Sequence, residues 1–559
     1  MLCFSQQKQL TPFEIGNKNQ STTYDECLSF YTSLDKKSEK ISLKKMGATD
    51  SGKPLHIVIF SDNSNFNFNQ NKAILFINNG IHPGEPDGID ATMMLMRDLT
   101  LKKIKVPLNT IVVAIPAYNI DGMLNRNTSS RANQNGPEQY GFRGNGRNFD
   151  LNRDFIKSDT RNSRSFQEIF HLINADVFLD NHVSNGADYQ HTFTCITTQH
   201  EKLGANLGQF FKNEMYPDLV LDMKNKNIDV VPYVNIHGDK PDLGYEQFAD
   251  SPRYSTGYAS LFNVLGFVPE THMLKPFEDR VKATYEFMVS TINYTEKNYI
   301  QIKKLRKEAR SQYQYAQQYP LHWKIDSSKV STINFKGFEA SYKPSDISGK
   351  NRLFYDRSKP FTKQIPFYGD YKPTKFITIP KFYIIPQNQW NIIELLQLNK
   401  IEMTQISKNE TLDVEIYKIN KYQTYKNAYE GHYGHYNTSV TKHSEKLNFV
   451  KGDYKISTNQ AGVKFLLETL EPEAVDSYFN WNFFDTILQQ KEGYSNYVFE
   501  DEAVHVLKEN PAVKADFDKK KLSDKNFSEN AEAQLDWIYQ QSKYFEKAYM
   551  RIPVYRVLN

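Results

Sequence analysis

Short apolar runs alternate with amphipathic segments over the first 295 residues of the chain. Uninterrupted apolar runs at residues 55–60, 73–77 and 109–115 predict buried strands. Apolar residues at helical spacing predict a helix over residues 87–99. The same patterns continue downstream, with helices expected over 166–173 and 201–214 and strands over 176–179 and 191–197. This alternation indicates an α/β fold, with a mixed, mostly parallel sheet and helices on both of its faces.

The pattern changes near residue 295. Residues 297–318 are polar and basic and favour a helix, which predicts a solvated connecting helix. Short alternating segments rich in Pro, Thr, Val, Ile and Tyr follow, and they favour a β-rich domain, with a sandwich as one option. The rest of the chain returns to helical patterns. We therefore expect four parts: an α/β domain (1–295), a connecting helix (296–318), a β-rich accessory domain (319–460) and a mainly helical C-terminal region (461–559).

Length and composition narrow the class of protein. The 559 residues exceed the size, about 250–300 residues, at which a single hydrophobic core stops growing. A hydrophobic content of 39% and a charged content of 24% fit a globular protein rather than a disordered one. The net charge of +4, from 69 basic and 65 acidic residues, argues against a nucleic-acid-binding protein. No apolar run reaches the length of about 18 residues that a membrane span needs, so we expect none.

The cysteines and the N-terminal segment give little information about the fold or the location of the protein. Cys3, Cys27 and Cys195 are far apart and lack CxxC spacing, so neither a disulfide framework nor a cysteine zinc site is expected. The segment Met1–Gln7 is too short for a signal peptide, and it fits either a frayed terminus or the tail of a signal peptide that begins upstream. The protein would be periplasmic or secreted in the second case and cytoplasmic in the first. The sequence does not indicate an oligomeric state.

The first candidate site follows the predicted strand at residues 73–77. His82 and Glu85 lie three residues apart across a Pro-Gly turn, so that an imidazole and a carboxylate can converge on one point. In open α/β sheets, ligands bind beyond the carboxyl ends of the strands, which is where this turn is expected. An HxxE pair alone is common by chance, and a surface turn with a solvated glutamate is the alternative.

Two further strand ends carry matching chemistry. His182 follows the predicted strand at 176–179, so we expect it at the same edge of the sheet. Two histidines and one glutamate form a ligand set of catalytic zinc, which leaves one position open for water. Glu270 follows a short apolar segment and is expected at this edge too, where a carboxylate can take a proton from a metal-activated water.

Asn152 and Arg153 form the last candidate element, in the sequence DLNRDF. The planar guanidinium of arginine holds a carboxylate through two parallel hydrogen bonds, and a neighbouring asparagine adds a neutral donor. The alternative is a basic loop that pairs with Asp150 and Asp154.

The motifs HPGE, DLNRDF, DNH and PET, in this order and spacing, resemble the M14 family of zinc carboxypeptidases over roughly residues 20–295. The resemblance implies a zinc carboxypeptidase-like catalytic domain that holds one Zn²⁺ ion per chain. It also implies the site residues by position: metal ligands His82, Glu85 and His182, a general base at Glu270, and a clamp of Asn152 and Arg153 for the C-terminal carboxylate of a peptide. The long second half is similar to the β-rich C-terminal extension of large bacterial members.

Two roles in the family have more than one candidate here. An arginine upstream of the Asn-Arg pair polarises the scissile carbonyl, and of Arg126 and Arg131 we favour Arg131. A tyrosine before the late glutamate caps the substrate, and of Tyr254 and Tyr258 we favour Tyr258.

The resemblance implies a metallopeptidase, specifically a carboxypeptidase that removes C-terminal residues from peptides or proteins by metal-activated water. One alternative is a zinc-dependent deacylase of N-acyl amino acids, similar to aspartoacylase and succinylglutamate desuccinylase. A non-catalytic binding protein is another, although none of the zinc and base residues is missing. The histidines of Glu430-Gly-His432-Tyr-Gly-His435 resemble a second metal motif, but the glycines and tyrosines around them favour a loop.

Overall fold

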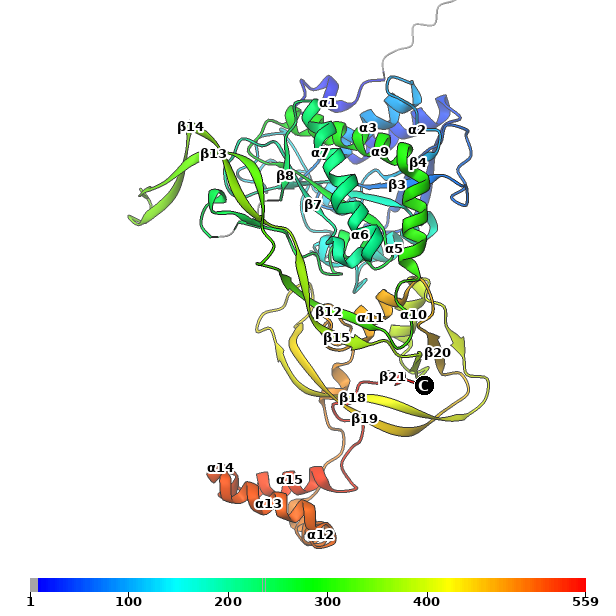
Figure 1. Cartoon of the computed structure of the whole chain (residues 1–559), viewed down its shortest axis with the longest axis vertical. Helices are drawn as coiled ribbons and strands as arrows, with labels where there is room; N and C mark the ends of the chain where they lie inside the picture. Colours follow the sequence, from blue (N-terminus) through cyan, green and yellow to red (C-terminus); the bar gives the residue numbers. More distant parts are fainter. Residues whose placement is uncertain (1–8, 234, 237) are drawn as a thin grey trace, which may run out of the picture.

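The computed structural model describes residues 9–233, 235–236 and 238–559. The chain forms a sheet-and-helix part, a β-rich part and a small group of helices, which follow one another along the long axis of the molecule (Figure 1). The segment Met1–Gln7, with Cys3, lies outside the described residues, so the interpretation of the N-terminus stays a prediction. Cys27 and Cys195 are buried free thiols. Among the described helices, none is long and apolar enough to cross a membrane.

A nine-stranded mixed sheet forms the centre of the first part. Its strands are β1 (Ile41–Ala48), β2 (Pro54–Phe60), β3 (Ala73–Asn78), β4 (Thr110–Ile115), β5 (Val177–Asp180), β6 (His182–Ser184), β7 (Phe193–Thr197), β8 (Val230–Pro232) and β11 (Leu265–His272). The order is β1-β2-β4-β3-β5-β11-β7-β8, and β6 pairs with β11. The central run β4-β3-β5-β11 is parallel, whereas β1, β2 and β7 pair antiparallel with their inner neighbours.

Helices cover the sheet. They are α1 (Pro12–Ile15), α2 (Tyr24–Lys37), α3 (Asp87–Thr100), α4 (Ile120–Leu124), α5 (Arg161–Ile173), α6 (Ala205–Phe210), α7 (Tyr216–Asn225), α8 (Ser255–Ser260) and α9 (Phe277–Arg310). Neighbouring residues of β11 point to opposite faces of the sheet. An added Cβ at Gly266 would meet Thr256 of α8, whereas Phe267 contacts Phe287 of α9. Helices therefore lie on both faces, and the predicted mixed α/β fold is confirmed.

Strands β3 and β4 are buried along their whole length. Their unbroken apolar sequences are therefore typical of strands covered on both faces, rather than of strands with one wet face. One predicted element differs: the helix expected over 201–214 is broken into a 3₁₀ turn (His200–Leu203), α6 and a π-helical turn (Phe211–Met215) that leads into α7. Gly204, with a φ of 95°, interrupts the helical path at its start.

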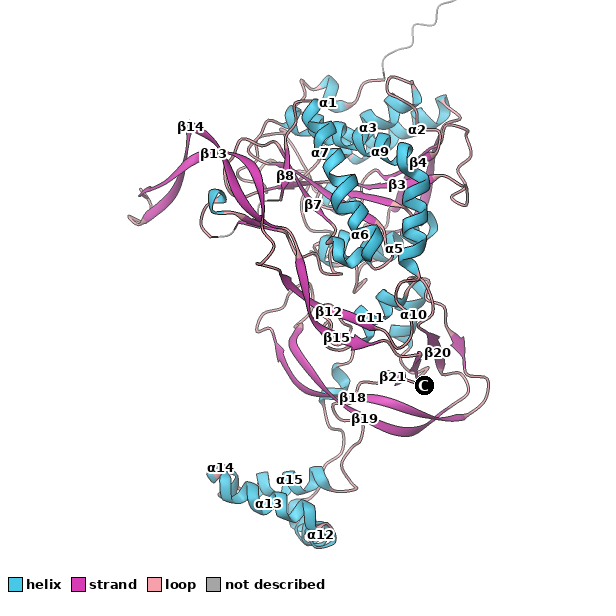
Figure 2. Ribbon diagram, viewed as in Figure 1, coloured by secondary structure: helices cyan, strands magenta, loops and turns pink. Residues whose placement is uncertain are grey.

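The second half of the chain, from β12 onward, is called the extension below. Its strands are β12 (Gln318–Ile325), β13 (Ser331–Pro344), β14 (Asn351–Tyr368), β15 (Tyr371–Thr378), β16 (Phe382–Ile385), β17 (Thr404–Gln405), β18 (Glu410–Thr424), β19 (His435–Phe449), β20 (Tyr454–Ser457) and β21 (Tyr555–Val557). They form a two-stranded sheet β12-β15, a six-stranded sheet β17-β20-β16-β21-β18-β19, and a long β13–β14 hairpin that pairs with β10 (Tyr245–Glu246), beside β9 (Asn235–Ile236). Figure 2 shows this strand-rich middle of the molecule in magenta.

Six helices belong to the extension: α10 (Trp390–Leu398), α11 (Val463–Leu470), α12 (Asn496–Glu509), α13 (Pro511–Ser523), α14 (Lys525–Ser528) and α15 (Ala531–Gln541). The last four have a small hydrophobic core of their own around Phe499, Phe517 and Tyr539. They lie at the end of the molecule away from α1 (Figure 1). The chain then returns to the six-stranded sheet, because β21 pairs with β16. The three predicted boundaries between the four parts stay predictions, and α9 spans the first of them with a kink at Asn298.

The extension packs against the first part through a continuous hydrophobic core. Phe465 of α11 stacks on Phe262, with ring centroids 5.8 Å apart. A buried polar contact joins α5, α8 and α10: the Tyr258 hydroxyl donates to Asn399 Oδ1 at 2.6 Å and lies 3.2 Å from His171 Nε2. Burial lowers the pKa of His171 to about 4.

The contact at His171 predicts a pH-dependent stability. The folded protein keeps His171 uncharged down to about pH 4, whereas an unfolded chain takes up its proton near the ordinary pKa of about 6.5. The unfolded state binds more protons between these values, so the free energy of unfolding falls as pH drops through this window. Between pH 7 and pH 5, the wild type should lose about 1–2 kcal/mol more than a His171→Asn variant.

Urea unfolding at the two pH values measures this difference. A His443→Asn variant, which changes an exposed histidine of β19, is the matched control and should lose as much stability as the wild type. Equal losses in the wild type and in His171→Asn would show that His171 does not resist protonation in the folded protein.

Candidate metal centre and pocket

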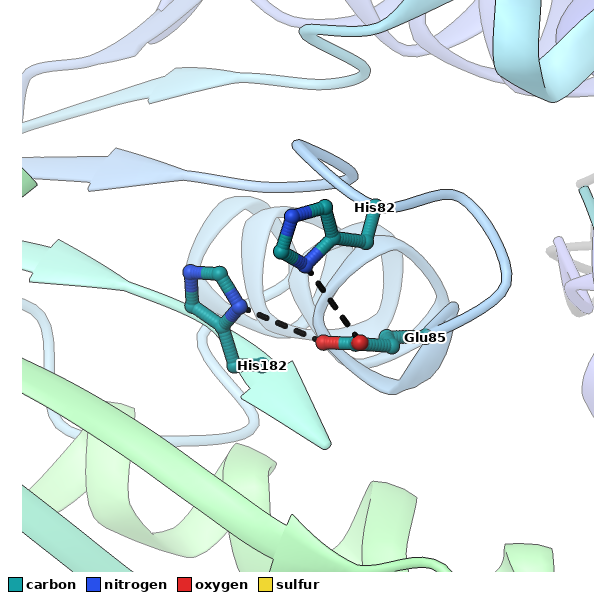
Figure 3. Close-up of side chains that lie close together, drawn as sticks. All are labelled: His82, Glu85 and His182. Carbon is teal, nitrogen blue, oxygen red and sulfur yellow. Dashed lines mark hydrogen bonds and ion pairs between the residues drawn. The ribbon is translucent and has the colours of Figure 1, made fainter. Parts of the chain in front are cut away.

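Three predicted metal ligands meet at the carboxyl edge of the sheet. His82 and Glu85 lie in the turn between β3 and α3, and His182 begins β6. His82 Nδ1 lies 3.3 Å from one carboxylate oxygen of Glu85, and His182 Nδ1 lies 3.2 Å from the other (Figure 3). All three side chains are at least 95% buried. The structure therefore brings together residues that are 97 positions apart in the chain.

The far nitrogens of both rings bond to carboxylates. His82 Nε2 lies 2.8 Å from Asp150 Oδ1, and His182 Nε2 lies 3.0 Å from Asp180 Oδ2. Such a partner places the proton on Nε2 and leaves the lone pair on Nδ1. The two Nδ1 lone pairs then face the negative oxygens of Glu85, an arrangement that a cation between them stabilises.

The three side chains form a suitable ligand set for a metal ion. The three ligand atoms all lie within 4.8 Å of one another. His82 Nδ1 is buried and has no hydrogen bond from any described residue. Two imidazoles and one carboxylate, each imidazole supported by a second carboxylate, are the arrangement found around catalytic zinc.

Glu270 stands beside this cluster because of strand register. It pairs with His182 across the parallel strands β11 and β6, and both residues line the same pocket. Burial raises the pKa of Glu270 to about 8, and the nearby charge of Glu85 adds to the effect, while His182 and Arg131 oppose it. A carboxyl group with a raised pKa is suited to taking up and returning a proton.

Two arginines reach the cluster, and only one of them was predicted. Arg131 Nη1 lies 2.7 Å from Glu85 Oε1. Arg143 Nη2 lies 2.9 Å from Asp150, and its Nη1 lies 3.4 Å from Glu85. Sequence analysis missed Arg143, although it lies in a glycine-flanked turn directly before the DLNRDF segment, which was the available signal.

The other candidate arginine is engaged elsewhere. The guanidinium of Arg126 donates to backbone oxygens of Ser21, Thr22 and Gln139 and does not line the pocket. Its role is to hold the N-terminal segment against the sheet-and-helix part, which agrees with the preference for Arg131.

Asn152 and Arg153 also line the pocket and lie in a short 3₁₀ turn. The turn is fixed by Asp150, whose Oδ1 accepts a hydrogen bond from the backbone nitrogen of Asn152 at 2.9 Å. The guanidinium of Arg153 lies 4.7 Å above the ring of Tyr254. Of the two acidic partners considered for this loop, Asp154 bonds instead to Lys157, Thr160 and Ser163. Asp150 does pair with Arg153, whose Nη1 lies 3.9 Å from Asp150 Oδ2.

The prediction for Tyr258 is wrong. This side chain is fully buried, and its hydroxyl is bonded to Asn399 rather than directed into the pocket. Residues 255–260 form a helix, α8, which turns Tyr258 toward the extension and away from the metal cluster. Tyr254, at the N-cap of α8, and Tyr233 line the pocket instead. The sequence offered both Tyr254 and Tyr258, and only the packing of α8 separates them.

The pocket has a volume of about 190 Å³. Its lining also includes Ile196, Phe248 and Val268, together with the buried Asp250. Burial raises the pKa of Asp250, although Lys202 lowers it. The pocket is large enough for one amino-acid side chain and has both apolar and acidic surface.

The chain is similar to one family of known proteins. The sequence model of one protein family, described as zinc carboxypeptidase (peptidase family M14), matches residues 28–319. A search of the curated proteins finds no match.

Solved structures of metallocarboxypeptidases are similar at low sequence identity. One is from Burkholderia cenocepacia (15% identity, 50% of this chain and 70% of that chain, TM-score 0.38). A second is from Pseudomonas aeruginosa (11% identity, 50% and 70%, TM-score 0.39), and a third is carboxypeptidase A from Helicoverpa armigera (13% identity, 52% and 73%, TM-score 0.37).

The carboxylates behind the two histidines predict how strongly the site holds zinc. Replacing Asp180 by Asn removes the negative charge behind His182 and should lower zinc affinity about 10–100-fold. Asp150→Asn should act in the same direction through His82. Competition with a chelator measures the affinity. An Asp62→Asn variant is the control, because Asp62 pairs with Lys72 and not with a histidine. If Asp180→Asn and Asp150→Asn bound zinc as tightly as the wild type, the assignment of the metal ligands would be contradicted.

Proposed function

Because the chain belongs to the M14 family of zinc carboxypeptidases, we propose that this metallopeptidase removes residues one at a time from the carboxyl ends of peptides. The observation that carries the proposal is the composition of a single pocket. His82, Glu85, His182, Glu270, Asn152 and Arg153 all line it. A peptide bond and a free carboxylate one residue beyond it can therefore be held at the same time.

His82, Glu85 and His182 would hold the zinc ion in this proposal. The bound ion supplies a Lewis acid, which polarises a carbonyl group and makes a nearby water more acidic. Asp150 and Asp180 keep the two imidazoles in the tautomer that coordination requires.

Arg153 and Asn152 would bind the terminal carboxylate of the peptide. A partly exposed guanidinium beside a neutral amide can bind a carboxylate strongly, because charge-assisted hydrogen bonds are the stronger ones. This clamp sets the distance from the chain end to the reacting bond.

Arg143 would polarise the scissile carbonyl. Its side chain is 47% exposed and lies at the pocket, so it can reach a bound substrate while it remains near Asp150. Arg131 is more buried and is held by Glu85 and by the backbone oxygen of Val183. We therefore assign the carbonyl-polarising role to Arg143, and to Arg131 the neutralisation of Glu85. This assignment revises the earlier preference for Arg131.

Glu270 would transfer a proton from the attacking water to the leaving peptide nitrogen. As a base it takes a proton from the attacking water, whose oxygen forms a bond to the carbonyl carbon. As an acid it returns that proton to the peptide nitrogen when the carbon–nitrogen bond breaks. The products are a shortened peptide with a new carboxylate and a free amino acid.

Replacing Glu270 by Gln tests the general base. The variant should bind zinc as the wild type does, because Glu270 is not one of the three clustered ligands. Turnover of an N-blocked dipeptide should fall by about 10²–10⁴-fold. Zinc analysis and steady-state kinetics give the two readouts. Near-normal turnover would rule out Glu270 as the base. Wild-type cleavage of N-acyl amino acids but not of blocked dipeptides would favour the deacylase alternative.

Replacing Arg143 by Ala tests the carbonyl-polarising role. Since that contact strengthens as charge develops on the oxygen, kcat should fall by about 10²–10³-fold while KM changes much less. Arg147→Ala, which alters an exposed arginine four positions along the same segment, is the matched control and should keep wild-type kcat. A loss confined to KM would place Arg143 in ground-state binding instead.

A further inference from the structure

The extension contacts the Asn152–Arg153 side of the pocket through one tight turn. Residues Tyr429–His432, between β18 and β19, form this turn, and we call it the Tyr429–His432 turn. The backbone nitrogens of Tyr429 and His432 each donate to the other residue's carbonyl oxygen, at 2.8 and 3.0 Å. Glu430 and Gly431 occupy the two central positions with φ values of 49° and 79°. Glycine adopts this backbone readily, but glutamate does so at a cost that its surroundings must offset.

Every residue of the turn contacts the segment that carries the predicted carboxylate clamp. The Tyr429 hydroxyl accepts a hydrogen bond from Arg153 Nε at 2.8 Å, across 276 positions of the chain. Glu430 accepts one from the backbone nitrogen of Asp150 at 2.8 Å, and a Cβ at Gly431 would lie 3.1 Å from Phe149. His432 Nε2 lies 2.8 Å from Asp159. The contacts made by the four residues of the turn thus hold the strained backbone at Glu430 in place.

A second segment of the extension supports the turn from behind. Trp481 stacks on Tyr429 with ring planes 20° apart, and the Arg253 guanidinium lies 4.8 Å above the Trp481 ring. Arg253 is paired with the buried Asp476 at 2.7 Å. Arg253 directly precedes Tyr254, the tyrosine beneath Arg153. The two tyrosines that contact Arg153, Tyr429 and Tyr254, are therefore both supported by residues of the extension.

These contacts fix the plane of one guanidinium group. Tyr254 covers one face of Arg153, Nη1 donates to the backbone oxygen of Asn152 at 2.8 Å, and Nε donates to Tyr429. Bidentate recognition of a carboxylate depends on the orientation of this plane, because the donors of arginine lie in it. A side chain that is already oriented loses less entropy when its ligand binds.

We propose that the Tyr429–His432 turn is part of the substrate site, and that Tyr429 positions Arg153 for the C-terminal carboxylate of the peptide. This inference rests on the proposed function. Tyr429 is a positioning residue, because it acts through Arg153 and not on the reacting atoms. The extension thereby completes the substrate site of a catalytic centre whose metal ligands all lie in the first half of the chain.

Tyr429→Phe tests the proposal, because it removes the hydroxyl and keeps the ring that stacks on Trp481. The KM for an N-blocked dipeptide with a free carboxylate should rise about tenfold, since a hydrogen bond to a charged group is worth more than one between neutral groups. The kcat should stay within about twofold, because the clamp binds the carboxylate equally in the ground and transition states. Tyr425→Phe, in the same loop but stacked on Tyr436, is the matched control and should match the wild type.

A double-mutant cycle separates positioning from a general structural effect. Lysine has no counterpart of the Arg153 Nε–H group, so Tyr429→Phe should have no further effect on KM in an Arg153→Lys background. The inference is overturned if KM is unchanged in Tyr429→Phe, or if the effects of the two substitutions simply add. A wild-type protein that does not hydrolyse the dipeptide would instead overturn the proposed function, and this inference with it.

Discussion

The candidate site depends on one buried carboxylate, Glu85. A buried charge is costly unless several partners neutralise and hydrogen-bond it. Arg131, His82, His182 and the backbone nitrogen of Val183 all contact it. Burial would raise the pKa of Glu85, but the charge of Arg131 holds that pKa well below its ordinary value. These partners come from three separate segments, so the carboxylate requires the β3 turn, the Arg131 loop and β6 to be in place together.

The sheet explains why such distant segments meet. Strands β3, β5 and β11 are parallel neighbours, so their carboxyl ends lie at one edge, and β6 continues from β5 beside β11. His82 and His182 lie just beyond the ends of β3 and β5, and Glu270 lies within β11, near its carboxyl end. The extension packs on this part of the chain through a shared hydrophobic core, and its Tyr429 contacts Arg153 at the pocket. The proposed role of Tyr429 would make the packing of the extension a condition for substrate binding.

Sequence reasoning succeeded where the chemistry is local and failed where it depends on packing. HPGE and DNH follow apolar strands, so the topology of an α/β sheet was enough to expect His82, Glu85 and His182 at one edge. Tyr258 was misplaced because only the docking of α10 on α8 shows which way a tyrosine of that helix turns. Arg143 was missed because its neighbours are glycines and other loop residues without periodicity. No pattern in the sequence connects Tyr429 with a residue 276 positions earlier.

X-ray absorption spectroscopy at the zinc edge tests the central claim, that one zinc ion is held by two imidazoles and one carboxylate. The purified protein should contain one zinc per chain, with two nitrogen neighbours at about 2.0–2.1 Å, oxygen neighbours at about 2.0–2.2 Å and no sulfur in the first shell. The histidine contribution should halve in a His182→Ala protein. A sulfur shell, or a spectrum unchanged by that substitution, would contradict the account.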